Sequence, residues 1–142
     1  PMKRLTMRNH QREVGFDSPV LRRQMRWLLD NAFNWAEYKI AVHFVSAKHM
    51  AKMNHEHLGH EGTTDILTFD YEEAIHSGEI FICPAVAAKN AALHKEALMT
   101  ELTRYLIHGL LHMSGHDDKV LTARRKMKRE ENRLLRLLLS DG

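Results

Sequence analysis

The chain has 142 residues, of which 44% are hydrophobic, and this amount suits one compact domain with a single buried core rather than two domains. Its one cysteine, Cys83, excludes an internal disulfide and a cysteine-rich zinc knuckle, so a tightly held transition metal would need ligands from the eleven histidines and the carboxylates. The net charge of +3 permits attraction to nucleic acid but does not establish it. No stretch reaches the roughly 20 apolar residues of a membrane span, and the amino terminus lacks the pattern of a signal peptide. We therefore expect a cytoplasmic protein with no membrane partner.

The first half of the chain alternates between strand and helix patterns. Part of residues 3–14 predicts an edge strand. A helix is expected over about 17–35, because an aspartate that can cap it is followed by serine, proline and apolar residues at helical spacing. The β-branched, alternating residues 40–45 predict a strand, and Ser46 can cap a helix that continues to about His57.

The second half begins with a predicted hairpin and continues with helices. Residues 64–71 alternate as a strand does, and a short polar link ending at Ser77-Gly78 leads into a second strand over 79–82. Pro84 opens an alanine-rich helix, and two further helical patterns follow over about 96–113 and 120–139, the last of them basic and amphipathic. The pattern predicts one α+β domain over residues 1–142, with a small mixed sheet of about four strands and about five helices.

The informative segment runs from His108 to Asp118 and reads HGLLHMSGHDD. His108 and His112 lie four residues apart on a predicted helix, so both imidazoles project from one face and can share a single ion. Ser114-Gly115 ends the helix, because glycine accepts the left-handed conformation that reverses the chain, and a residue just beyond can then supply a third ligand. Three protein ligands leave a position for water, which is the arrangement of catalytic zinc sites.

The histidine pair has two other interpretations. The imidazoles could form hydrogen bonds only, at the edge of a helix, but the glycine stop and the clustered ligand residues favour a metal. The helix is zincin-like, yet a zincin protease has its general-base glutamate directly after the first histidine, and this chain has Gly109 there. Peptide hydrolysis of the zincin kind is therefore disfavoured.

These residues resemble the YbeY family of rRNA maturation factors, whose signature reads His-Gly-x-Leu-His-x-x-Gly-x-Asp-His. The resemblance extends upstream to Met53-Asn54, to the segment TTDILTF at 63–69 and to GEIFI at 78–82, and it covers about residues 40–120. It implies a zinc-dependent, single-strand-specific endoribonuclease of small-subunit rRNA 3′-end maturation and ribosome quality control. The metal would lower the pKa of a bound water that attacks a phosphodiester. The partner implied is rRNA or the small ribosomal subunit, and DNA is not expected.

The first departure from the family concerns the third ligand, because this chain has Asp118 where the family usually has histidine. A carboxylate also ligates zinc, so Asp118 is the predicted third ligand, with His116 as the competitor if the turn is tighter. A carboxylate lowers the net charge of the site, which makes bound water less acidic and can admit other divalent ions. If His116 does not bind the metal, it is the candidate general acid or base.

The second departure is Leu58, which stands where the family has an arginine and can neither bind phosphate nor stabilise charge. Cleavage of a phosphodiester needs a cation near the developing negative charge, and His57 and His60 are nearby candidates. Elsewhere, basic residues could guide an RNA backbone towards the site. They are Lys89, Lys95, Arg104 and the run Arg124, Arg125, Lys126, Lys128 and Arg129, although Glu130 and Glu131 follow this run, as on a solvated helix of mixed charge.

The amino-acid sequence leaves two rival functions open. One is a ribosome-associated RNA-binding factor with a structural or vestigial metal site, and the less favoured one is a zincin-like peptide hydrolase.

Overall fold

The computed structural model describes residues 1–58 and 65–141, with the side chains of Leu58 and Asp141 outside the description. Within this part, four strands form one mixed sheet in the order β1-β2-β4-β3. The strands are β1 (Lys3–Asn9), β2 (Tyr38–Phe44), β3 (Ile66–Asp70) and β4 (His76–Ile82). The pairs β1–β2 and β2–β4 are parallel, and β3 and β4 form the predicted antiparallel hairpin. The expected α+β class, the mixed sheet and the edge position of β1 are confirmed.

The helices of the described residues also follow the prediction. They are α1 (Ser18–Trp27), α2 (Ala47–Leu58), α3 (Pro84–Leu93), α4 (Leu98–Met113) and α5 (Leu121–Asp141). The two predicted caps are present, because Asp17 accepts a hydrogen bond from the Val20 amide at 3.2 Å and Ser46 accepts one from the His49 amide at 3.1 Å. None of the helices in this part of the chain has the length and apolar composition needed to cross a membrane.

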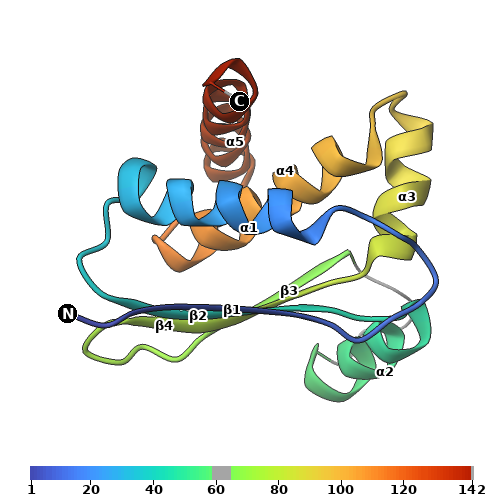
Figure 1. Cartoon of the computed structure of the whole chain (residues 1–142), viewed down its shortest axis with the longest axis horizontal. Helices are drawn as coiled ribbons and strands as arrows, with labels where there is room; N and C mark the ends of the chain where they lie inside the picture. The colour runs from blue at the N-terminus through green and yellow to red at the C-terminus, as the bar shows by residue number, and fades with distance from the viewer. Residues whose placement is uncertain (59–64, 142) are drawn as a thin grey trace.

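The sheet is covered unequally on its two faces (Figure 1). Helices α1, α4 and α5 lie on one side of it, where the alternate residues of β2 are fully buried: Tyr38, Ile40, Val42 and Phe44. Helix α2 lies on the other side, where Met50 and Met53 pack with Leu67 in a smaller cluster. The sheet is thus a rigid base against which α4, the predicted metal helix, is packed.

Two boundaries differ from the expectation. Ser77-Gly78 is part of β4 and not of the link, because Gly78 pairs with Ile40 of β2 and with Asp70 of β3. A Cβ at Gly78 would lie 2.5 Å from the Phe69 carbonyl oxygen. This glycine therefore marks a close approach within a strand and not a turn. The first helix was expected to about Trp35, but its regular α-helical part ends at Trp27 and continues as the π-helical segment Leu28–Ala32 (η1).

Candidate metal centre

Helix α4 supplies the two histidines predicted from the sequence. Most of its residues are buried against the sheet and the neighbouring helices, whereas the side chains of His108 and His112 are 24% and 29% exposed. Their ring centroids lie 4.7 Å apart with the ring planes at 80°. The pair therefore sits at the edge of the core, as expected for side chains one helical turn apart beside an apolar stripe.

A glycine turn ends α4 and brings the next residues back to the histidines. Gly115 has a φ of +106°, and the amides of Gly115 and His116 donate to the carbonyls of His112 (3.1 Å) and Leu111 (3.0 Å). This closes the helix as a glycine C-cap does, and the chain reverses. As a result, Asp118 Oδ2 lies 3.8 Å from His108 Nε2 and 3.7 Å from His112 Nε2.

The geometry and chemistry of this triad fit a divalent metal. Ligand atoms about 2.0–2.1 Å from a tetrahedral zinc ion are about 3.3 Å apart, so an inward movement of a few tenths of an ångström would suffice for the distances to Asp118. Among the described residues, His108, His112 and Asp118 are the one group of His, Cys, Asp and Glu side chains close enough to hold an ion, with ligand atoms within 4.8 Å of one another. His116 is not part of this group, although its position beside the turn made it the competing ligand.

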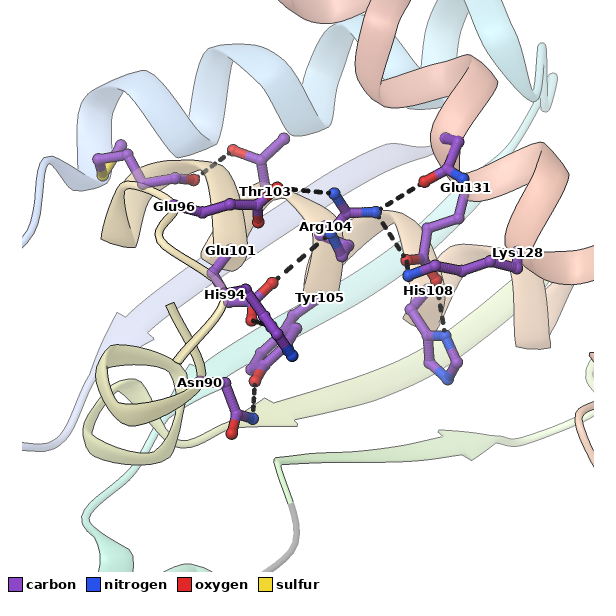
Figure 2. Close-up of polar contacts among 12 residues, drawn as sticks. Asn90, His94, Glu96, Glu101, Thr103, Arg104, Tyr105, His108, Lys128 and Glu131 are labelled. Atoms are coloured by element: carbon purple, nitrogen blue, oxygen red, sulfur yellow. Dashed lines mark hydrogen bonds and ion pairs between the residues drawn. The ribbon is translucent and has the colours of Figure 1, made fainter. Parts of the chain in front are cut away.

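A residue that the sequence analysis did not select, Glu131 of α5, binds the back of His108 (Figure 2). Its Oε2 lies 3.1 Å from His108 Nδ1, across 23 positions of sequence. Burial opposes ionisation of Glu131, but the hydrogen bond with His108 and the charge of Lys128 outweigh it and lower its pKa. The ionised carboxylate can only accept, so Nδ1 carries a proton, and in the neutral imidazole the lone pair of Nε2 then faces Asp118 and His112. This is the tautomer that a metal ligand needs.

The carboxylate of Glu131 is itself held by two cations. Its Oε1 lies 3.2 Å from Arg104 Nη1 and 3.2 Å from Lys128 Nζ. The residue is 5% exposed, and both of its oxygens have partners, since Oε1 contacts the two cations and Oε2 contacts His108. Glu131 therefore belongs to the interior of the site, and the expectation that it lies on a solvated helical face was wrong.

Arg104 was one of the residues that could guide RNA, but it is engaged within the protein. Its guanidinium also contacts Glu96 at 3.2 Å and Glu101 at 3.5 Å, and its side chain is only 16% exposed. Figure 2 shows it between the end of α3 and α5, surrounded by carboxylates. It thus joins α4 to α5 and to the loop that precedes α4, and it has little capacity left for a phosphate group.

The protonation of His112 also suits a metal ligand. Burial and the neighbouring His108 lower its pKa below the usual range for histidine, while Asp118 and the backbone of His116 act in the opposite direction. A lowered pKa keeps the imidazole neutral at pH 7, and a metal binds only the neutral form.

The structure gives a steric reason for Gly109 after the first histidine. A Cβ at this position would lie 2.8 Å from Ile80 Cδ1 and 3.1 Å from two other atoms of that side chain. Position 109 therefore faces β4 at a close helix–sheet contact, where a side chain would require Ile80 to move. A zincin-type glutamate at this position would crowd Ile80, which agrees with the sequence argument against a zincin peptidase.

Two of the three donors, His108 and Asp118, line a cleft of about 770 Å³ together with residues of α3, α4 and α5. Asn90 donates to the Tyr105 hydroxyl at 2.7 Å on its wall, and burial raises the pKa of Tyr105, so this hydroxyl is neutral at physiological pH. The candidate cation His57 does not line the cleft, and its ring lies edge-on to Phe69 with centroids 5.6 Å apart.

Some residues singled out in the sequence lie outside the description. They are His60, Thr63 and Thr64, together with the side chain of Leu58.

The fold and the site together define an α+β protein with a metal-competent His-His-Asp cluster at the end of a helix packed on a mixed sheet. The chain belongs to the YbeY family, because the family model described as "Endoribonuclease YbeY" matches residues 6–138. The resemblance inferred from the sequence motifs is confirmed.

Individual relatives agree with this assignment. The protein named Endoribonuclease YbeY from Elusimicrobium minutum is 36% identical over 98 residues, which cover 65% of this chain and 68% of the relative. The protein of the same name from Chlorobium phaeovibrioides is 35% identical over 96 residues, covering 67% of this chain and 65% of the relative. The solution structure of TM1509 from Thermotoga maritima, 23% identical, has a TM-score of 0.71 with 96% of this chain and 90% of that chain covered. This last likeness concerns the fold alone.

Proposed function

We propose that residues 1–142 form one YbeY-like metallohydrolase domain, a metal-dependent endoribonuclease that cleaves single-stranded RNA. The observation that carries this proposal is the cluster of His108, His112 and Asp118 beside a cleft, in a chain that belongs to the YbeY family. Relatives named Endoribonuclease YbeY support RNA as the substrate. The role proposed is 3′-end maturation of small-subunit rRNA and ribosome quality control in the cytoplasm, with rRNA or the small ribosomal subunit as partner.

The proposed ligands are His108 Nε2, His112 Nε2 and a carboxylate oxygen of Asp118, and the proposed ion is zinc. A divalent ion held there would lower the pKa of a coordinated water towards 7 and neutralise charge on a phosphodiester. Glu131 keeps His108 in the required tautomer and orientation, and Arg104 and Lys128 hold Glu131 in place. The carboxylate in the donor set also permits manganese or another hard divalent ion.

We further propose that His116 transfers a proton during cleavage. It lies next to the turn that carries Asp118, is partly exposed and lies close enough to Glu130 to influence the pKa of that carboxyl group. Because its imidazole is not part of the ligand group, it is available as a general acid or base.

The purified protein is expected to cleave a single-stranded rRNA fragment when zinc, manganese or magnesium is supplied, and to spare a fully paired duplex of the same sequence. A chelator should stop the reaction, and the return of the ion should restore it, because water activation depends on the metal. The measurement is the rate of product formation on a labelled fragment, with a peptide substrate as a parallel control.

Absence of RNA cleavage with all three ions would contradict the proposed activity. Bound zinc and RNA affinity without cleavage would instead support an RNA-binding factor with a vestigial metal site. Chelator-sensitive cleavage of the peptide would indicate the zincin-like hydrolase that Gly109 argues against.

A further inference from the structure

The cleft beside the triad is lined by four cationic side chains in addition to its histidines. They are Arg104, Arg124, Arg125 and Lys128. Two of these are committed to the protein's own carboxylates, since Arg104 contacts Glu96, Glu101 and Glu131, and Lys128 contacts Glu131. Their charges stabilise the interior of the site and are compensated there.

Arg124 and Arg125 differ from the other two cations. Both side chains are exposed, and neither forms an ion pair or a side-chain hydrogen bond within the described part of the chain. They lie near the start of α5, and both line the cleft; Arg124, seven positions before Glu131, is on the same face of the helix as the carboxylate that binds His108. The two guanidinium groups are thus uncompensated charges at the mouth of the candidate site.

The remaining charges of the cleft favour a role for these two arginines with an anionic substrate. Five carboxylates line it: Asp65, Glu96, Glu101, Asp118 and Glu131. Four cations nearly balance these five carboxylates, whereas Arg104 and Lys128 alone would leave two cations against five, and an RNA backbone would then meet a strongly negative cleft. An arginine fork matches the geometry of a phosphate group and binds it with two parallel hydrogen bonds.

We propose that Arg124 and Arg125 bind the phosphate backbone of the RNA that enters the cleft and hold it against the metal-competent triad. This inference rests on the proposed endoribonuclease function and adds to it the residues that position the substrate. Such contacts carry no base specificity, so the two arginines set affinity and register rather than sequence preference.

The test compares two charge-reversed double variants of the same helix, R124E/R125E and K126E/R129E. Lys126 and Arg129 are also exposed and basic, but they do not line the cleft, so the second variant changes the net charge equally without altering the site. Each protein is titrated into a fluorescent single-stranded RNA at several salt concentrations, and zinc stoichiometry and thermal unfolding are measured in parallel.

R124E/R125E is expected to weaken RNA binding by about tenfold or more. The slope of the logarithm of the binding constant against the logarithm of the salt concentration should become smaller in magnitude by about 1.4, because each phosphate contact on a single strand contributes about 0.7. K126E/R129E should weaken binding by less than about threefold, and both variants should retain zinc and fold normally.

Equal losses in the two variants, or no loss in R124E/R125E, would overturn the inference. RNA cleavage by the wild-type protein distinguishes this outcome from failure of the proposed function. Normal RNA cleavage by the wild type with an unaffected R124E/R125E would refute the arginine contacts alone, whereas a wild type that binds zinc but never cleaves RNA would refute the activity.

Discussion

The His112→Ala variant is expected to lose its bound metal and to cleave RNA at least about a thousandfold more slowly than the wild type. Removal of one imidazole leaves only two protein ligands for the metal. A metal supplies several kcal/mol of transition-state stabilisation, and each 1.36 kcal/mol lost slows the reaction about tenfold. The side chain is 29% exposed and forms no part of the packed core, so folding should persist. RNA affinity should also persist, because the proposed phosphate contacts lie on α5.

The matched control is His49→Ala, which removes an exposed imidazole from α2 on the other side of the sheet. It should retain full metal content and activity. If His112→Ala kept both its metal and its cleavage rate, the triad would not be the catalytic centre. If it lost the metal but also lost RNA binding with intact folding, the ion would serve binding rather than catalysis.

Glu131→Ala is expected to lower the free energy of unfolding by about 2–4 kcal/mol, because it leaves the partly buried Arg104 and the Nδ1 of His108 without their partner. The metal affinity should fall about 10–100-fold, the usual cost of removing a hydrogen-bond partner behind a ligand histidine. Denaturant unfolding in the presence of a chelator measures the first effect, and competition with a zinc indicator measures the second. Glu131→Gln preserves the shape and one acceptor, so it should recover part of the stability.

Glu130→Ala is the control for this prediction. Glu130 is the neighbouring residue on α5 and pairs with Arg133 near the surface, where a salt bridge contributes less than about 1 kcal/mol. It should leave metal affinity unchanged. Equal behaviour of Glu130→Ala and Glu131→Ala would contradict the assigned role of Glu131 behind His108.

The triad could be predicted because all its determinants are local. His108 and His112 lie one turn apart on a helix, and Gly115 reverses the chain, so the position of Asp118 follows within eleven residues of sequence. The same holds for the caps at Asp17 and Ser46, where a side chain bonds an amide three residues later. Such features depend on short-range geometry and not on how distant elements pack.

Glu131 could not be assigned in this way, because its role depends on the packing of α5 against α4. Its neighbours in sequence include many charged residues, which is typical of a solvated helix. A signal was nevertheless present, since Glu131 lies in register with Met127, Leu134 and Leu138, all of which are buried. A lone carboxylate within an apolar stripe indicates a buried partner, here His108 and Arg104.

The most direct test of the metal centre is the zinc content of the purified wild type, Asp118→Ala and His116→Ala proteins, measured by elemental mass spectrometry after equilibration with zinc. The triad predicts about one ion per chain in the wild type and in His116→Ala, and almost none in Asp118→Ala. Loss of zinc in His116→Ala with retention in Asp118→Ala would contradict the assignment of the third ligand. A wild type without bound zinc would contradict the centre itself.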